Sequence, residues 1–307
     1  MTELVVEVNN LSRNFGKTDA LDCVDFKASR GKVYGLVGAN GAGKTTLIKH
    51  LLGLLRAKSG SVRIFGEDPV RNPEGVLKRI GYLSEDRDIP EWMSIDELMR
   101  YTSAYHSTWD QSYAAELLRT FSLDPAKKIK TLSRGMRAQV ALISAVAHRP
   151  DLLILDEPSS GLDAVVRKDI LNAVVRTISE EGRTVIFSSH LLEEVERLSD
   201  HVTMIHEGKI TLDSSLELIN NNHHCSSISF ADLQNSPPIL EGVVEISGEG
   251  RSFSVVHQGS IDAFQDAVRK IGGEILKSRH ATLEEVFVSR VGRPDIAELG
   301  QVKENTK

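Results

Sequence analysis

The sequence predicts an α/β fold, in which helices cover a parallel β-sheet, followed by a small α+β domain. Short apolar runs rich in β-formers, such as 33–37 and 152–155, alternate with helical patterns over the first 215 residues. Such alternation is typical of a parallel sheet that is buried on both faces. A purely helical pattern fills about 90–149, and the length of 307 residues fits about two domains.

In the first domain, 1–215, the expected elements follow one another with short connections. We expect strands over 5–8, 24–28, 33–37, 62–65, 152–155, 184–187 and 202–205. Helices are expected over 44–54, 163–179 and 190–198. In the helical insertion, Ser133 is placed to cap a helix that stops before Pro150.

The second domain is expected over 227–292. A polar stretch within 216–226, NNNHH at 220–224, indicates a linker, and the residues 293–307 form a polar tail. Between them we expect strands over 227–230, 243–246, 253–256 and 274–277, and helices over 261–271 and 282–289. This domain shows no residues that suggest catalysis.

Composition narrows the function classes. Lys and Arg number 37 against 43 Asp and Glu, a net charge of −6, which argues against nonspecific nucleic-acid binding. Two cysteines cannot form a disulfide scaffold and suit a reducing compartment. The longest nearly apolar run, 140–147, is far shorter than the ~20 residues of a membrane span. We therefore expect a cytoplasmic chain that reaches a membrane only through another polypeptide.

A glycine-rich loop carries the strongest chemical signal. The residues GANGAGKT follow the strand 33–37, open the helix 44–54 and fit the P-loop pattern. Backbone N–H groups of such a loop and the following helix N-terminus bind phosphate oxygens. Lys44 would reach the β- and γ-phosphates, and the Thr45 hydroxyl would bind Mg²⁺. The expected nucleotide-binding residues here are Gly38, Asn40, Gly41, Ala42, Gly43, Lys44, Thr45 and Thr46.

Two carboxylates end the buried strand at 152–155. Asp156 is suited to holding Mg²⁺, and Glu157, one residue further, can polarise an attacking water. An apolar strand that ends in acids is common and more often structural. With the P-loop upstream, however, the pair indicates the second half of a nucleotide site.

Three more segments, LSRGM at 132–136, SSGLD at 159–163 and SSH at 188–190, complete a set of ordered motifs. Together with the P-loop and the acidic strand end, their order and spacing resemble the nucleotide-binding subunit of an ATP-binding cassette (ABC) transporter, over about residues 3–215. The resemblance implies a P-loop NTPase, RecA-like cassette with a helical subdomain at about 90–149. It also implies ATP hydrolysis with Mg²⁺ and two cassettes, identical or different, paired head to tail.

The resemblance also assigns roles to individual residues. Ser133 and Gly135 would cap the γ-phosphate of ATP bound to the partner cassette, and Asp163 would sense the partner's site. Glu157 would be the catalytic base, and His190 would contact the γ-phosphate and orient the water. Phe15 matches the position of the ring that stacks on adenine, although a core residue is the alternative.

Three departures from the family pattern stand out. Glu85 occupies the place of a usual glutamine, where it can still bind Mg²⁺ but adds negative charge beside phosphates. Arg134 and Met136 replace the usual glycine and glutamine of the signature segment, and Phe15 replaces the commoner tyrosine. We expect slower or differently gated hydrolysis from Glu85.

The segment ATLEEVF at 281–287 resembles the accessory domain of exporter-type cassettes. It favours export through a separate transmembrane permease, with the cassette peripheral on the inner face of the membrane and no nucleic acid bound. In the family, the region of Trp92 borders the groove for the permease's coupling helix; core packing is the alternative.

A soluble cassette ATPase acting on ribosomes or DNA is the hypothesis that competes with a transporter subunit. A third class, a GTPase, would need a guanine-reading motif, which we do not find. A metal site at His223, His224 and Cys225 competes with the linker interpretation, which we favour.

Overall fold

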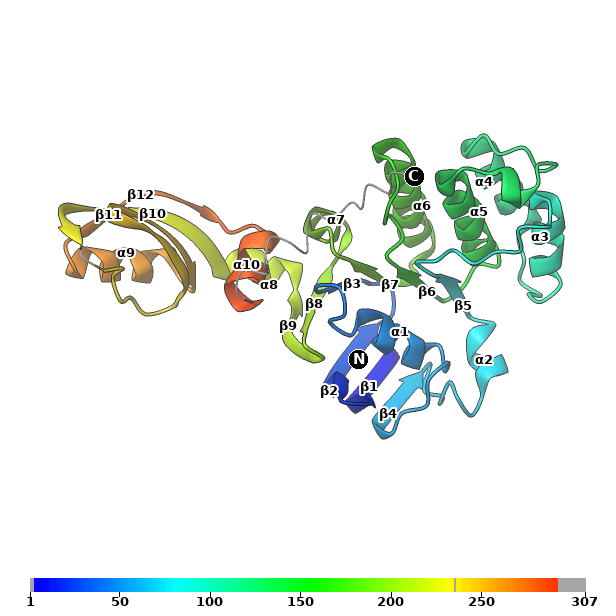
Figure 1. The fold of residues 1–307 in the computed structure, drawn as a ribbon, viewed down its shortest axis with the longest axis horizontal. Coiled ribbons are helices and arrows are strands. Elements are labelled where there is room, and N and C mark those ends of the chain that lie inside the picture. The colour runs from blue at the N-terminus through cyan, green and yellow to red at the C-terminus, as the bar shows by residue number, and fades with distance from the viewer. Residues whose placement is uncertain (1–2, 235, 292–307) are drawn as a thin grey trace. The chain divides into compact units, whose positions relative to one another are not determined.

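The computed structural model describes residues 3–234 and 236–291, and the chain divides into two compact units after Asp213. The predicted tail at 293–307 lies outside the described residues. The first unit holds a parallel sheet, an antiparallel sheet and a helical subdomain, and the second holds a small sheet with helices (Figure 1).

The main sheet of the first unit has the strand order β5-β6-β7-β3-β8-β9. Its strands are β3 (Val33–Val37), β5 (Ile80–Leu83), β6 (Leu152–Asp156), β7 (Thr184–Ser189), β8 (His201–His206) and β9 (Lys209–Ser215). The pairs β5/β6, β6/β7, β3/β7 and β3/β8 are all parallel. Every residue of β3, β6 and β7 is buried, as expected for a sheet covered on both faces. The predicted parallel α/β arrangement is confirmed.

The helices of this layer follow the strands that they cover. They are α1 (Lys44–Leu51), α2 (Pro73–Leu77), α6 (Ala164–Glu181) and α7 (Leu192–Leu198). The helix α1 starts at Lys44 as predicted and ends three residues earlier than expected. The helix α7 begins at Leu192 rather than at His190, which leaves His190 in the loop after β7.

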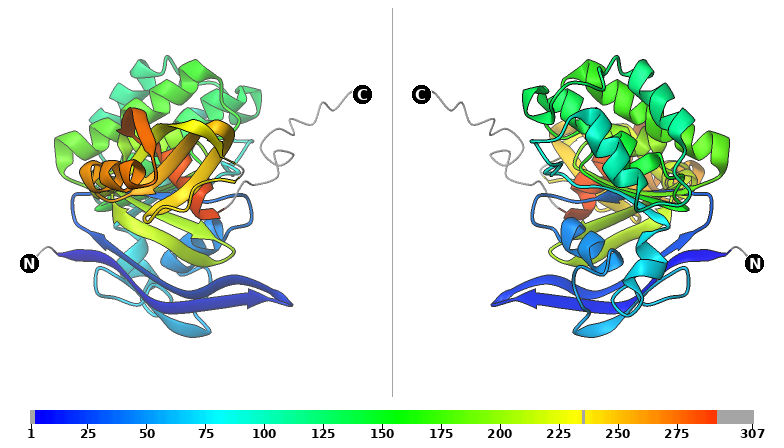
Figure 2. Two further views of the ribbon diagram at one scale, coloured as in Figure 1. Left: turned by 90° about the vertical axis from the view of Figure 1, so that its left-hand side faces the viewer. Right: turned by 90° about the vertical axis from the view of Figure 1, so that its right-hand side faces the viewer.

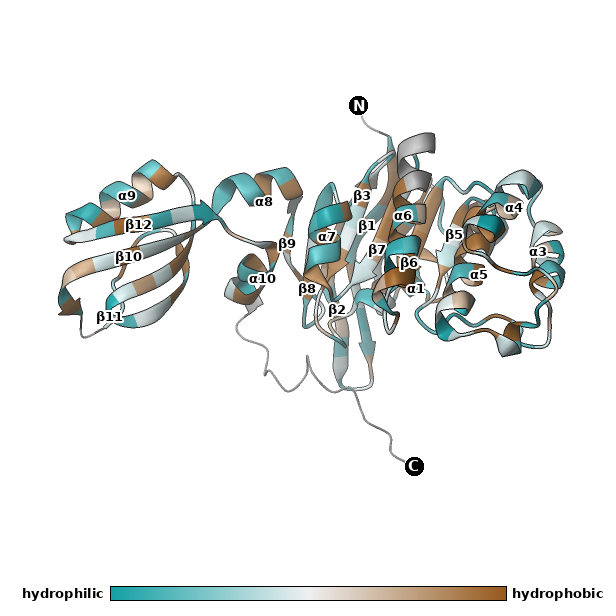
Figure 3. Ribbon diagram, turned by 90° about the horizontal axis from the view of Figure 1, so that it is seen from above, coloured by the Kyte–Doolittle hydropathy of each residue, from teal (hydrophilic) through white to brown (hydrophobic). Residues whose placement is uncertain are grey.

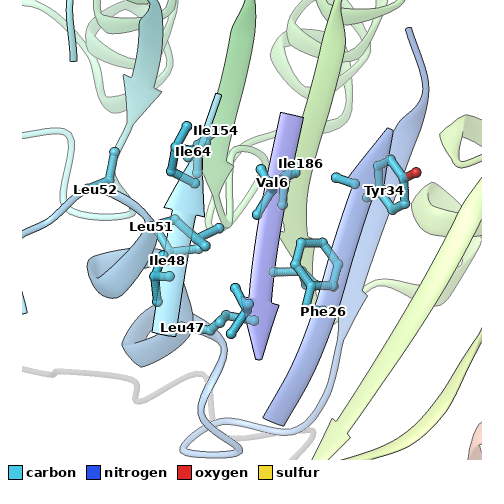
Figure 4. Close-up of a cluster of buried hydrophobic side chains, with 14 of the residues drawn as sticks. Val6, Phe26, Tyr34, Leu47, Ile48, Leu51, Leu52, Ile64, Ile154 and Ile186 are labelled. Atoms are coloured by element: carbon cyan, nitrogen blue, oxygen red, sulfur yellow. The ribbon is translucent and has the colours of Figure 1, made fainter. Parts of the chain in front are cut away.

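An antiparallel sheet of order β2-β1-β4 packs beside α1. Its strands are β1 (Leu4–Phe15), β2 (Thr18–Ser29) and β4 (Ser59–Ile64), and β1 with β2 makes the long hairpin seen in Figure 2. Both strands are longer than predicted, because register shifts let the pairing continue through polar residues. Leu47, Ile48 and Leu51 project from α1 into a core that Val6 and Phe26 complete (Figure 4).

The predicted helical subdomain is present. It contains α3 (Ile95–Ser103), α4 (Gln111–Thr120), the short 3₁₀ helix η1 (Ile129–Thr131) and α5 (Arg134–Val146). Each α-helix begins after a side chain that accepts the backbone N–H three residues ahead: Ser94, Asp110 and Ser133. Every residue from Ala138 to Ile143 in α5 is buried, and Figure 3 draws part of this helix in brown for its apolar residues.

The second unit is an antiparallel sheet of order β11-β10-β12. Its elements are α8 (Leu216–Asn222), β10 (His223–Gln234), β11 (Val243–Gln258), α9 (Ile261–Lys270), β12 (Gly273–His280) and α10 (Leu283–Val291). Phe264 and Val268 of α9 pack on Ile228, Phe230 and Val255 of the sheet. The two strands that we expected at 243–246 and 253–256 are one continuous strand.

The predicted linker at 216–226 is wrong. The residues 216–222 form α8, and β10 starts at His223, where His223, His224 and Cys225 are buried against the neighbouring strands. No group of three or more His, Cys, Asp or Glu side chains that could hold a metal ion occurs in the described part of the chain, so the metal alternative gains no support there. In the same residues, no helix has the length and apolar character to cross a membrane.

Candidate functional site

The glycine loop between β3 and α1 is shaped by its lack of side chains. A Cβ atom on Gly38 would overlap the carbonyl oxygen of Ile205, and one on Gly43 would meet the carbonyl oxygen of Ala20 at 2.5 Å. Gly43 also has φ of 116°, a conformation that L-residues rarely adopt. The loop is thus closely packed from below, and α1 begins directly after it with its N-terminus free of any side-chain cap.

Lys44 folds back over this loop. Its Nζ donates to the carbonyl oxygens of Gly38 at 2.7 Å and Ala39 at 3.4 Å. The same Nζ lies 3.2 Å from Oε1 of Glu157, and both side chains are only 6% exposed. The lysine at the start of α1 and the carboxylate directly after β6 therefore form a buried ion pair.

Glu157 is also bound from β7's side. Its Oε2 lies 2.6 Å from Nδ1 of His190 and accepts the backbone N–H of His190 at 3.4 Å. Glu157 has φ of 48°, which turns its carboxylate out of the strand line of β6. The structure thus brings together three predicted residues, Lys44, Glu157 and His190, from three separate segments.

Protonation in this group follows from the charges. Burial opposes ionisation of Glu157, but its hydrogen bond with His190 and the charge of Lys44 outweigh burial and lower its pKa. The hydrogen bond to Glu157 raises the pKa of His190, against the effects of burial and of Lys44. The carboxylate is therefore ionised, and the imidazole is biased toward its charged form.

Asp156 is held by a residue that the sequence analysis missed. The Ser188 hydroxyl donates to Oδ1 of Asp156 at 2.7 Å and accepts the backbone N–H of Glu157 at 2.8 Å. Both Asp156 and Ser188 are buried. One hydroxyl on β7 therefore fixes both acidic residues at the end of β6, and its place directly before Ser189-His190 was the only sequence signal.

Glu85 lies in the turn after β5, on the same edge of the sheet. Partial burial raises its pKa first, and the negative charges of Glu157 and Asp156 raise it further, while Lys44 lowers it. These interactions place Glu85 within electrostatic reach of the Lys44–Glu157 pair. Its carboxylate adds a third acidic group to this edge.

The signature segment begins α5 in the helical subdomain. Ser133 is exposed and caps α5 through the backbone N–H of Met136 at 3.2 Å. Gly135 is buried against Val166, where a Cβ would lie 2.9 Å from Cγ2. Asp163 is exposed and accepts the N–H groups of Val165 and Val166. In the described residues no hydrogen bond or ion pair joins Ser133 or Asp163 to the glycine loop.

The remaining predicted ligands lie on or near the loop. Asn40 and Gly41 are exposed, Ala42 is buried, and Thr45 and Thr46 on α1 are half-buried. Phe15 is 48% exposed at the end of β1, with the guanidinium of Arg13 4.7 Å from its ring centre. The core alternative for Phe15 is therefore wrong, because its ring is about half exposed and the Arg13 guanidinium lies over one face.

The residues present fit a nucleotide with Mg²⁺. Gly38 and Gly43 leave backbone where side chains would block it, and the Lys44 ammonium lies 3.2 Å from Oε1 of Glu157 at the mouth of the loop. The Thr45 hydroxyl and the carboxylates of Asp156 and Glu85 are hard oxygen donors, the type that Mg²⁺ binds. Because they include only two carboxylates, oxygens of the phosphates would have to complete the coordination.

A glycine loop that opens a helix, a buried lysine and paired acids at the end of β6 define a P-loop nucleoside triphosphatase. Comparison with known proteins narrows the class further. The family model for ABC transporters matches residues 21–160. The uncharacterised ABC transporter ATP-binding protein YdbJ of Bacillus subtilis is 34% identical over 219 residues, 71% of each chain. This chain belongs to the ABC transporter family and is an ATP-binding, ATP-hydrolysing subunit.

Two further matches extend the likeness. The bacitracin transport ATP-binding protein BcrA of Bacillus licheniformis is 29% identical over 302 residues, covering 94% of this chain and 97% of the relative. A solved structure of an ATP-binding subunit of an ABC transporter shares 28% identity with a TM-score of 0.65. The match covers 71% of this chain and 92% of the chain in that structure. The BcrA match therefore extends into the second unit.

Proposed function

We propose that this chain is the motor subunit of an ABC exporter, in which ATP hydrolysis drives a separate transmembrane permease. The observation that carries the proposal is the buried group of Lys44, Glu157 and His190 beside the glycine loop. The BcrA match, whose printed name is a transport protein, supports the exporter type because it spans both units. The site thus supplies ATPase chemistry, and the relatives suggest what that chemistry drives.

In the proposed mechanism, the phosphates of ATP displace the interactions that Lys44 makes within the loop and with Glu157. Lys44 leaves the carbonyls of Gly38 and Ala39 and the carboxylate of Glu157 to bind the β- and γ-phosphates. Backbone N–H groups of the glycine loop and of the start of α1 bind the same phosphates. Phe15 stacks its exposed ring on adenine.

Displacement of Lys44 prepares Glu157 to act as a base. The lysine and His190 hold the pKa of Glu157 down, while burial alone would raise it. When the γ-phosphate competes for Lys44 and His190, Glu157 loses the stabilisation of its charge and becomes a better proton acceptor. It then takes a proton from the attacking water, which His190 orients.

Mg²⁺ would be held by Thr45, Asp156 and Glu85, with Ser188 keeping Asp156 in place. When bound, it neutralises charge on the β- and γ-phosphates. Glu85 brings one more negative charge to this site than a glutamine would. That charge is the physical reason to expect a different rate or Mg²⁺ dependence.

ABC cassettes dimerise and act with membrane permease subunits. For this chain we propose a head-to-tail pair in which Ser133 and Gly135 face the partner's γ-phosphate. Ser133 is exposed at the N-terminus of α5, so its hydroxyl and the free N–H groups of that helix are available to an anion. Asp163 would lie in the loop between the two sites.

A surface groove is a candidate binding site for the permease. It has a volume of about 480 Å³ and is lined mainly by apolar residues, among them Leu52, Leu54, Leu77 and Tyr105. Leu54 and Tyr105 are 64% and 68% exposed, which is costly unless a partner covers them. We assign a short helix from a cytoplasmic loop of the permease as the occupant, which would make the cassette peripheral on the inner face of the membrane. Trp92, 70% exposed after β5, is not a core residue.

The deciding experiment is a pull-down with tagged Glu157→Gln, which should bind ATP and hydrolyse it very slowly. The bait is incubated with Mg-ATP and detergent-solubilised membranes of the native cell, with Lys44→Ala as the control that binds no ATP. A polytopic membrane protein recovered in near-equal amount with the first bait supports the motor proposal. Ribosomes or soluble proteins alone would overturn it in favour of a soluble cassette ATPase.

A further inference from the structure

Arg87 is a buried arginine that no motif accounts for. It is 7% exposed and ends the tight turn at 84–87 that follows β5 and contains Glu85. Its backbone N–H donates to the carbonyl oxygen and the hydroxyl of Ser84, at 3.2 and 3.1 Å. Its φ of 52° is a conformation that arginine rarely adopts. The turn is thus built to direct this side chain inward.

The guanidinium of Arg87 binds only backbone oxygens. Nη2 donates to the carbonyl of Ser160 at 2.7 Å and to that of Pro158 at 3.3 Å. Within the described residues no carboxylate forms an ion pair with it, although buried arginines usually have one. Two carbonyls from one loop are therefore what this buried charge recognises, and a single nitrogen, Nη2, donates to both.

The loop bound by Arg87 connects two residues of the proposed site, Glu157 at its start and Asp163 at its end. Ser159 is anchored from another side, because its hydroxyl donates to Oε2 of Glu194 on α7 at 2.6 Å. The N–H of Ser160 closes a turn on the carbonyl of Glu157 at 3.1 Å. Arg87 is thus the link from this loop to the segment after β5.

We propose that Arg87 is a positioning residue that couples the turn at 84–87 to the loop at 158–163. Any displacement of Glu85 when ligands bind is passed through the short turn to Arg87 and on to the carbonyls of Pro158 and Ser160. The position in which the loop presents Asp163 to the second cassette then depends on whether the Mg²⁺ site is occupied. This inference rests on the head-to-tail pair proposed above.

The test compares ATP binding with turnover in Arg87→Lys. Lysine keeps the charge, but its side chain is shorter and its ammonium stops short of the position that Nη2 occupies. We expect the Kd for a fluorescent ATP analogue and the KM to stay within about two-fold of wild type, and kcat to fall at least about ten-fold. Ser84→Ala, which removes one acceptor of the turn and threatens folding less, should lower kcat in the same way but by a smaller factor.

Arg149→Lys is the matched control, because Arg149 is also a partly buried arginine with positive φ, bound to Asp110 in the helical subdomain. It should leave kcat within about two-fold of wild type. Hydrogen exchange should show faster exchange at 158–163 in Arg87→Lys and not in the control. If Arg87→Lys keeps kcat, or loses ATP binding and kcat together, the coupling role is wrong.

A second measurement separates this inference from the proposed dimer. Glu157→Gln should form a dimer with Mg-ATP in gel filtration, and Glu157→Gln with Arg87→Lys should form markedly less. If Glu157→Gln alone stays monomeric, the dimer proposal fails and the inference falls with it. If both dimerise equally, the dimer stands and the role of Arg87 is overturned.

Discussion

Nζ of Lys44 lies 3.2 Å from Oε1 of Glu157, and each side chain is 6% exposed. The proposed phosphate-binding cation and the proposed catalytic carboxylate thus neutralise each other within the site. A buried pair of this kind is costly to break by removing one partner, because the other charge remains buried. Nucleotide binding supplies a new anion to Lys44 and leaves Glu157 without that cation.

Glu157→Gln is expected to separate ATP binding from hydrolysis. The amide cannot accept the water proton, so kcat should fall by at least about 100-fold. Lys44 loses its buried anion and becomes free for phosphate, so ATP affinity should stay equal or rise. Phosphate release and binding of a fluorescent ATP analogue measure the two effects. Glu193→Gln, an exposed carboxylate on α7, should change neither. Retention of more than about a tenth of kcat would contradict a general-base role.

Ser188→Ala removes the hydroxyl that joins Asp156 to the backbone of Glu157. The change leaves buried polar groups without partners, so the free energy of unfolding should fall by about 1–3 kcal/mol. Turnover should drop about ten-fold because both carboxylates lose a fixed position. Ser144→Ala is the control, since that hydroxyl bonds only to the Val140 carbonyl within α5. Urea unfolding and kcat are the readouts, and equal effects of the two variants would refute the positioning role.

Glu85→Gln tests the extra negative charge beside the phosphates. With the charge removed, kcat at saturating Mg²⁺ should rise, because the γ-phosphate is no longer repelled. The Mg²⁺ concentration for half-maximal activity should rise as well, because a carboxylate binds the ion more strongly than an amide. Asp86→Asn removes an adjacent exposed charge and serves as the control. An unchanged rate and an unchanged Mg²⁺ dependence would show that Glu85 has no role at the metal.

His257 makes the second unit sensitive to acid. Burial first, and then the charge of His224, lower its pKa to about 4 from the ordinary 6.5. In the unfolded chain His257 binds a proton below about pH 6.5, whereas in the folded chain it does so only below about pH 4. The free energy of unfolding therefore falls as the pH drops through this window. The protonation of His257 alone should make the free energy of unfolding about 2 kcal/mol smaller at pH 5 than at pH 7.5.

His257→Phe should remove that part of the acid sensitivity. The ring of His257 already stacks on Phe264 at 3.6 Å, so a phenyl group suits the position. The Ser226 hydroxyl, which bonds to His257, keeps Ser278 as a partner at 2.9 Å. Denaturant unfolding of wild type and variant at about pH 5 and 7.5 gives the comparison. If the free energy of unfolding changes by the same amount between the two pH values in both proteins, the low pKa of His257 does not affect stability.

The phosphate loop and the acidic strand end could be predicted because their chemistry is local. Glycine spacing, the following helix and an apolar strand before two acids are visible within short windows, and β3 has the predicted bounds. The cap of α5 by Ser133 was predictable for the same reason. These features depend on neighbours in sequence and not on packing.

The residues that align the site were not predictable in this way. Ser188 acts on Asp156 across 32 positions, and Arg87 acts on Ser160 across 73. Likewise, the polar stretch around His223 and His224 was mistaken for a linker. Those imidazoles are buried by β11 and β12, which follow later in the chain. Only the pairing of distant strands reveals what such residues touch.

The strand that leads into the phosphate loop has a consequence for how the protein is made. The strand β3 ends at Val37, and its two neighbours in the sheet are β7 and β8. These two strands come much later in the chain, because β7 starts at Thr184. During synthesis the ribosome must therefore produce nearly two thirds of the chain before β3 gains either hydrogen-bonded partner. Until then the nascent chain carries the nucleotide motif without the sheet that shapes it. Chaperones or ATP can act on the finished loop only after β7 has emerged.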